Sequence, residues 1–233
     1  MNVLILGCSF GVPNYFGPPS PPPEAHTEFI LRGLGHTVIN CAKNGGSNLD
    51  SLKRAHAFLS GKPIAHPAHR NQAVQGIANQ SIDWIVWFHT ELYRDFLILP
   101  NKTNLYERDS VALAEMTYQA YRDFQHKTGA KLAVIGGAGD LHQCFDKYFT
   151  PEFVIRSWRS EILGIDNIPN NTLWQQEYFN HSKDTIKQKL IHLESNLDLL
   201  DLMNACADFP DNCHPGARPH RELSEKLHIT FQL

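Results

Sequence analysis

Three residues of the chain could together carry out nucleophilic catalysis: Ser9 near its start, and Asp211 and His214 near its end. A serine hydroxyl is a weak nucleophile at its own pKa and needs an adjacent base. Asp211 and His214 lie in a loop bounded by Pro210 and Pro215, so the carboxylate can accept the imidazole Nδ1 proton and leave Nε2 free as that base. A Gly-x-Ser after a strand and an Asp-x-x-His in a loop are each common in turns and surface loops. The hypothesis of a nucleophile with its base therefore depends on both motifs.

The elements that must position these residues follow a strand–helix alternation. Asn2–Leu6 is a short apolar run ended by Gly7, which predicts a buried parallel strand with Ser9 just past its carboxyl end. Further strands are predicted at 37–40, 82–88 and 131–135, and helices at 24–34, 49–59, 107–128 and 217–227. This order implies βαβ units, an α/β fold and a mostly parallel sheet whose carboxyl ends share one edge, where open α/β folds build their sites.

The chain is predicted to form one domain, 1–233, with about five strands. The fifth strand is expected at 153–155, with 199–202 as the alternative. The proline-rich stretch 12–23 must be an irregular loop, either a wall of the site or a plain connection. Irregular excursions are expected near 61–81, 93–105 and 158–180.

Composition argues against several classes of partner. A net charge of −3 gives no broad attraction to nucleic acid or to an anionic membrane. No apolar run approaches the roughly 18 residues of a membrane helix, and no secretory signal precedes the first strand. The five cysteines show no C-x-x-C spacing and are expected to be reduced thiols. We therefore expect a cytoplasmic protein that binds neither nucleic acid nor membrane.

No cofactor or metal is expected. His66 and His69 are close in sequence, but Pro67 lies between them and no acidic or cysteine partner is near. A flavodoxin-like nucleotide binder is a weak alternative, because no Gly-x-Gly-x-x-Gly or Walker pattern follows any predicted strand.

Four segments resemble, in order and approximate spacing, the four sequence blocks of the SGNH hydrolases, also called GDSL-type esterases. These segments are Gly7-Cys8-Ser9, Asn44-Gly45-Gly46, Phe88-His89-Thr90-Glu91 and Asp211-Asn212-Cys213-His214-Pro215. The resemblance spans 7–215 and implies a three-layer α/β/α sandwich resembling flavodoxin. It also implies a serine ester hydrolase that works through an acyl-enzyme.

The same resemblance assigns roles to individual residues. Ser9 would be the nucleophile, His214 the general base and Asp211 the residue that orients it. The backbone amides of Ser9 and Gly45 would form the oxyanion hole, and Thr90 stands where the family has the asparagine that completes it.

The chain departs from the family pattern at two blocks. Cys8 replaces the aspartate of Gly-Asp-Ser; a thiol nucleophile at Cys8 is the minor alternative to a small buried residue. Thr90 and Glu91 replace an asparagine and an aspartate, and a threonine hydroxyl is a shorter donor. Loss of one donor typically costs about 10²–10³ in rate. His89 is an alternative donor, although strand alternation would point it away from Thr90. Four neighbouring residues are predicted to contact substrate: Phe10, Gly46, His89 and Glu91.

The expected substrate is a small acyl ester, including acetyl groups on carbohydrate. Aromatic residues near strand ends would suit a sugar face or pack in the core: Trp87, Tyr93, Trp158 and Trp174. The alternative is an SGNH-fold binding or assembly protein with little turnover, since the sequence is also similar to SGNH-like proteins encoded by bacteriophages. That similarity leaves open a virion location, a virion partner and a homo-oligomer.

Overall fold

The computed structural model describes residues 1–13, 23–67, 72–90, 92, 95, 110–137, 141–163 and 215–233. Its centre is a five-stranded sheet in the order β2-β1-β5-β6-β7, and every neighbouring pair is parallel. The strands are β1 (Asn2–Gly7), β2 (Thr37–Asn40), β5 (Trp84–Phe88), β6 (Lys131–Ile135) and β7 (Phe153–Ile155). The predicted parallel sheet is confirmed, with its fifth strand at 153–155. The alternative at 199–202 lies outside the described residues.

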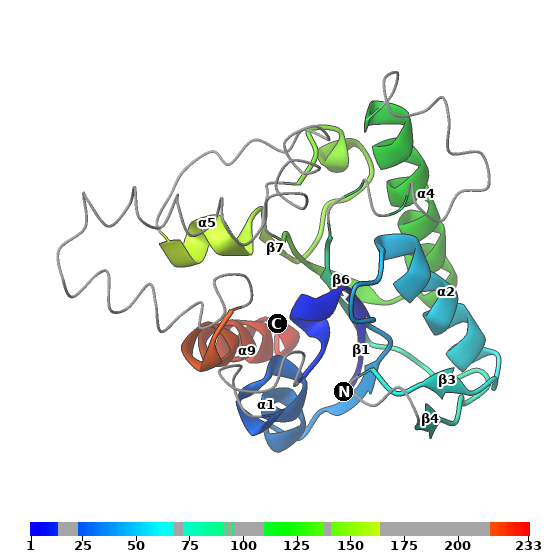
Figure 1. Cartoon of the computed structure of the whole chain (residues 1–233), viewed down its shortest axis with the longest axis vertical. Helices are drawn as coiled ribbons and strands as arrows, with labels where there is room; N and C mark the ends of the chain where they lie inside the picture. The colour runs from blue at the N-terminus through cyan, green and yellow to red at the C-terminus, as the bar shows by residue number, and fades with distance from the viewer. Residues whose placement is uncertain are drawn as a thin grey trace, which may run out of the picture.

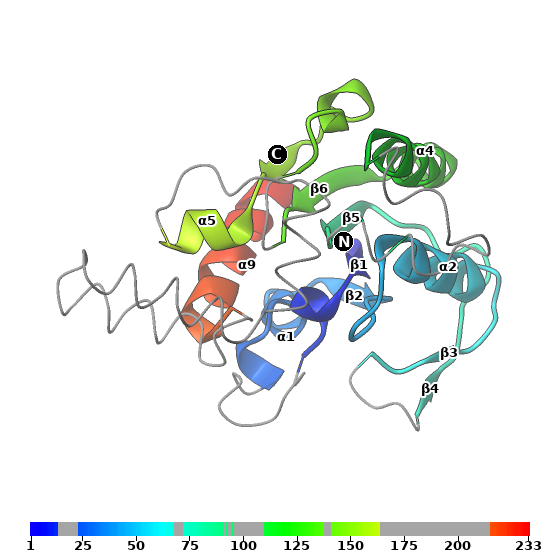
Figure 2. The same cartoon turned by 45° about the horizontal axis from the view of Figure 1, so that its top comes forward.

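Helices cover both faces of this sheet, which gives the predicted three layers (Figure 1; Figure 2). The described helices are α1 (Thr27–Gly33), α2 (Asn48–Leu59), α4 (Ser110–Thr128), α5 (Trp158–Leu163) and α9 (Ala217–Phe231). Leu4 and Leu6 of β1 pack in one core cluster with α2 and α4, whereas Val3 and Ile5 pack in the other with α1 and α9. Strand alternation in β1 therefore divides its apolar run between two cores.

The strand order places a topological switch point beside β1. The connection from β1 leads to β2 on one side, while β5 pairs on the other side. Gly7 lies opposite Phe88, and Phe88 lies opposite Ile135, so the segments that follow β1, β5 and β6 leave the sheet side by side. Open α/β sheets bind ligands at such a point.

Helix α1 differs from its prediction in length and in the face that it buries. The predicted apolar side included Phe29 and Leu34, yet each is 40% exposed, whereas Glu28 is buried. The reason is a polar contact: Asn40 of β2 donates from Nδ2 to Glu28 Oε2 at 2.7 Å, and Arg32 also donates to the same carboxylate. Leu31 of the predicted apolar side is buried as expected, and the hydrogen-bonded Glu28 carboxylate is buried together with it.

Two other elements extend beyond their predictions. The excursion at 61–81 contains a short antiparallel pair, β3 (Ile64–Ala65) and β4 (Ala73–Val74). Helix α9 continues past residue 227 to Phe231, because Leu227 and Phe231 share its buried face. Within the described ranges, no helix is long and apolar enough to cross a membrane.

Candidate functional site

Gly7 ends β1 in a conformation that requires glycine. Its φ is +120°, and a Cβ atom there would lie 1.9 Å from the carbonyl oxygen of Phe88. The chain then forms a 3₁₀ turn over Ser9–Gly11, in which the Gly11 amide donates to Cys8 O at 3.0 Å. Asn40 Nδ2 donates to Gly11 O at 2.7 Å and ties this turn to the end of β2. Ser9 therefore lies just past the carboxyl end of β1, as predicted.

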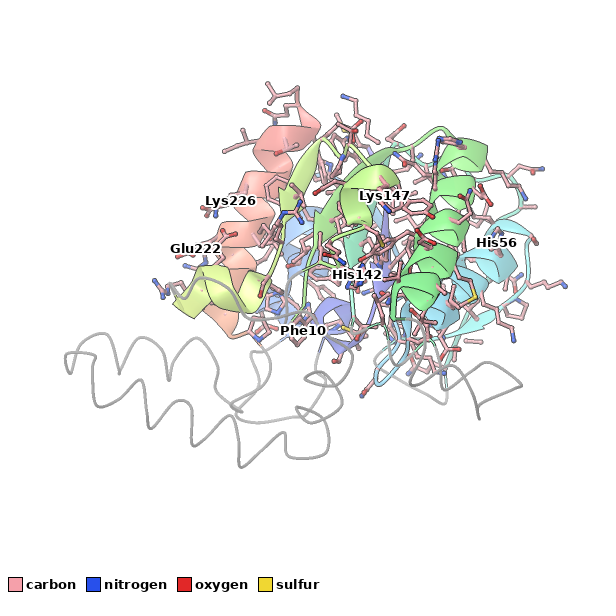
Figure 3. All side chains as sticks on the ribbon, turned by 90° about the horizontal axis from the view of Figure 1, so that it is seen from above. Phe10, His56, His142, Lys147, Glu222 and Lys226 are labelled. Atoms are coloured by element: carbon pink, nitrogen blue, oxygen red, sulfur yellow. The ribbon has the colours of Figure 1, made fainter. Side chains whose placement is uncertain are left out.

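The neighbours of Ser9 are part of the core. Cys8 and Phe10 belong to the apolar cluster on the α1/α9 face, and Phe10 meets Trp158 edge-on with ring centroids 6.1 Å apart. Figure 3 shows Phe10 between Glu222 and Lys226 of α9 on one side and His56 of α2 on the other. Cys8 matches the buried-residue interpretation. A contact between Phe10 and substrate stays a prediction.

The segment after β2 forms a tight turn beside Ser9. The Gly46 amide donates to Lys43 O at 2.9 Å, and Gly45 has a φ of +64°, which a glycine adopts without strain. The Lys43 amide donates to Gly7 O at 3.0 Å and fastens this turn to the end of β1. Gly45 is exposed, and its amide donates no hydrogen bond within the described part of the chain. A role for this amide in an oxyanion hole stays a prediction.

Thr90 follows β5 and is held through its backbone. Its amide donates to Asn48 Oδ1 at 2.9 Å, and its carbonyl accepts from Asn48 Nδ2 at 3.0 Å. Trp87 Nε1 donates to the same Asn48 oxygen at 3.0 Å. Both backbone polar groups of Thr90 are therefore engaged by Asn48, and a role for the Thr90 hydroxyl in an oxyanion hole stays a prediction.

Asn48, the first residue of α2, is a site-adjacent residue that the sequence analysis missed. Its amide cannot replace the family's missing asparagine, because one Nδ2 hydrogen goes to Thr90 O and the other to Asp95 Oδ2 at 2.9 Å. No local pattern could have revealed this role, since Thr90 and Asp95 are 42 and 47 positions away.

Asp95 is a second missed residue, inside the excursion predicted at 93–105. Its carboxylate is fully buried and accepts from Leu49 N at 2.8 Å and from Thr117 Oγ1 at 3.1 Å, besides Asn48. Burial raises the pKa of Asp95 to about 6, although these donors act to lower it.

His89 lies in the core on the α2/α4 side of the sheet. Its ring is 5.0 Å from that of Trp87, and its Nε2 is 3.4 Å from the Tyr118 hydroxyl. Burial lowers the pKa of His89 to about 3, so the ring is neutral near pH 7. It shares a face with Trp87, as strand alternation requires. A role for His89 in contacting substrate stays a prediction.

Two of the four aromatic residues considered for a sugar face are core residues. Trp87 is buried and stacks on Tyr121 at 3.7 Å, and Trp158 is buried against Phe10. The core-packing interpretation therefore holds for both. Tyr93 and Trp174 lie outside the described residues.

The predicted base His214 and its partner Asp211 also lie outside the described residues. The same holds for Glu91. Their pairing with Ser9 stays a prediction. Among the described residues, no group of three or more His, Cys, Asp or Glu side chains could hold a metal ion.

No protein-family model matches the sequence, and no curated protein matches it. The chain is similar to a solved structure reported as "The active site of a carbohydrate esterase displays divergent catalytic and non-catalytic binding functions". The TM-score is 0.49 with 12% sequence identity, over 99% of this chain and 68% of that chain. A similarity of this size carries no argument about activity, so the site must be judged on its own residues.

Proposed function

We propose that the protein is a serine ester hydrolase of SGNH type that acts on a small acyl ester, with acetylated carbohydrate as one candidate substrate. The observation that carries this proposal is the convergence of three separate segments at one sheet edge. Hydrogen bonds join the turn after β1 to the turn after β2, and join α2 to Thr90 after β5. This convergence supports the proposal that Ser9, Gly45 and Thr90 line one site at the switch point.

In the proposed reaction, Ser9 Oγ attacks the ester carbonyl carbon while His214 Nε2 accepts the hydroxyl proton. The amides of Ser9 and Gly45 and the hydroxyl of Thr90 donate to the oxyanion of the tetrahedral intermediate. Its collapse breaks the bond to the alcohol, which leaves with the proton from His214. Water, activated by the same base, then hydrolyses the acyl-enzyme, and Asp211 holds the imidazole in the required tautomer.

A chain of ring contacts supports the proposed position of the base. Phe10 packs on Trp158, and Trp158 lies edge-on to His220 with centroids 5.0 Å apart. His220 belongs to the start of α9, which begins at Ala217. The segment that carries His214 therefore joins a helix whose first turns are already connected to the Ser9 turn.

A binding or virion-assembly protein of the same fold is the second candidate. The observation in its favour is the small number of donors: the Thr90 amide and both Asn48 Nδ2 hydrogens are already engaged. An oxyanion would then rely on two amides and one short hydroxyl, which favours weak turnover.

Covalent labelling tests the proposal directly. The protein is treated with a fluorophosphonate probe and its intact mass is measured, for wild type, Ser9→Ala and His214→Ala. We expect one adduct on wild type and none on either variant, because only a serine activated by a base reacts. Ser51→Ala is the matched control, since it removes another buried serine and should leave the adduct unchanged.

The substrate class is then tested by comparing acetyl with longer acyl p-nitrophenyl esters, and with acetylated oligosaccharides. Absence of an adduct on folded wild type, together with absence of ester turnover, would contradict the enzymatic proposal and favour the binding protein. Turnover that survives Ser9→Ala would contradict Ser9 as the nucleophile.

A further inference from the structure

Asn48 and Asp95 form a buried polar pair directly behind the proposed oxyanion hole. Neither side chain is exposed to solvent, and Asn48 Nδ2 donates to Asp95 Oδ2 at 2.9 Å. We infer that Asn48, anchored by Asp95, is the positioning residue that sets where Thr90 presents its hydroxyl to the reacting ester. This inference rests on the proposed function and adds two residues to its machinery.

The Asn48 side chain binds Thr90 much as a neighbouring strand would. Its oxygen accepts from the Thr90 amide at 2.9 Å and its nitrogen donates to the Thr90 carbonyl at 3.0 Å. Two bonds from one planar carboxamide fix both the distance and the rotation of the Thr90 backbone. Trp87 Nε1 donates to the same oxygen at 3.0 Å and ties this contact to the last residues of strand β5.

Asp95 fixes which way the carboxamide faces. Its Oδ2 accepts the remaining Nδ2 hydrogen, so a flipped amide would turn a carbonyl oxygen against a carboxyl oxygen. Leu49 N at 2.8 Å and Thr117 Oγ1 at 3.1 Å hold the carboxylate between the first turn of α2 and helix α4. The orientation of Asn48 is therefore set by two helices and not by the Thr90 loop itself.

The need for such a support follows from the short side chain at position 90. A threonine hydroxyl reaches less far than the asparagine amide of the family pattern, so its backbone must be held in place. A displacement of about 1 Å can cost about 10²-fold in rate, close to the cost of losing an oxyanion donor outright.

The test compares Asn48→Ala and Asn48→Asp with a control on the same helix. Asn48→Asp keeps the shape and an acceptor for the Thr90 amide, but it cannot donate to the Thr90 carbonyl or to Asp95. Ser51→Ala is the control, because it removes buried hydrogen bonds of Ser51 Oγ to Tyr121 at 2.7 Å and to the Asn48 backbone carbonyl at 2.8 Å but leaves the Asn48 carboxamide in place. The readouts are kcat and KM for p-nitrophenyl acetate, thermal unfolding, and the NMR signals of the Thr90 amide and the Trp87 indole.

We expect both Asn48 variants to lose about 10²-fold in kcat with KM nearly unchanged, because the lost contact acts in the transition state. Ser51→Ala should lower the melting temperature and leave kcat unchanged. A folded Asn48 variant with wild-type kcat, or an equal loss of kcat in Ser51→Ala, would overturn the inference.

If neither Asn48 variant folds, the inference is tested by measuring kcat for Asp95→Asn. This substitution leaves one acceptor oxygen for two donors, Asn48 Nδ2 and Leu49 N, so it weakens the anchor while both Asn48–Thr90 bonds remain. The value of kcat should therefore fall by a smaller factor, and an unchanged kcat would overturn the inference. A wild-type protein without adduct or turnover would instead contradict the proposed function itself.

Discussion

At the scale of single residues, Ser9 owes its place to the glycine two positions before it. Gly7 turns the chain at a φ of +120° where any side chain would meet the Phe88 carbonyl, and the 3₁₀ turn follows at once. The glycine of the Gly-x-Ser pattern is thus required by backbone geometry at a crowded strand end, independently of the chemistry proposed for Ser9.

Replacement of Gly7 by alanine is expected to destabilise the fold strongly. The new Cβ would lie 1.9 Å from a backbone oxygen, which has to move, and the positive φ alone costs about 1–3 kcal/mol. Urea unfolding of Gly7→Ala measures the loss. Gly33→Ala is the control: no atom lies within 4 Å of its would-be Cβ, and alanine should stabilise helix α1 by about 0.5–1 kcal/mol. Equal stability of the two variants would contradict the argument.

At the scale of elements, the prediction succeeded where a segment's own residues decide its structure. Strands 37–40 and 131–135 match their predicted bounds, because short apolar runs between polar turns leave little choice. It failed where a polar partner on another element decides, as at Glu28 of α1, which is buried beside Leu31 because Asn40 donates to its carboxylate. The Asn48–Asp95 pair was missed for the same reason, since a contact across 47 positions exists only once the fold brings α2 and the segment after β5 together.

The final turn of α9 is expected to contribute substantially to stability. Phe231 is 2% exposed, and its ring centroid lies 4.7 Å from that of Trp84 at the start of β5. Phe231→Ala should cost about 3–5 kcal/mol in the free energy of unfolding, because it leaves a cavity in the core. Ile229→Ala, on the same turn but 63% exposed, should change it by less than about 0.5 kcal/mol. Similar losses for the two variants in urea unfolding would show that α9 does not pack there.

At the scale of the whole molecule, two buried groups, Asp95 and His89, change the free energy of unfolding in opposite directions as the pH changes. The folded pKa of Asp95 is raised to about 6, so the folded state holds that proton more tightly, and the stability this provides is lost as the pH rises through 6. The folded pKa of His89 is lowered to about 3, so stability is lost as the pH falls below the ordinary histidine value. Between about pH 4 and 6 the two slopes partly cancel.

Asp95→Asn removes the contribution of Asp95 to the pH dependence of stability, so the loss of stability on acidification that comes from His89 should become visible. From pH 6.5 to 4, the variant should lose about 2 kcal/mol more stability than wild type, which corresponds to the part of the Asp95 pKa shift that lies in this pH range. Urea unfolding at several pH values measures this difference in slope, which is independent of any constant cost of the substitution. Parallel curves for the two proteins would mean that Asp95 is not protonated on acidification in the way its burial requires.

The order of the strands also bears on how the protein acquires its site. β1 pairs with β2 at a separation of 35 positions (Asn2 with Thr37) but with β5 at a separation of 81 positions (Val3 with Trp84), and pairings between such distant segments form slowly. Ser9, Gly45 and Thr90 each follow a different one of these strands. During refolding, helices and the β1–β2 pair can be complete while the proposed oxyanion hole still lacks Thr90. Recovery of activity would then follow the closing of the β1–β5 pair and not the earlier gain of secondary structure.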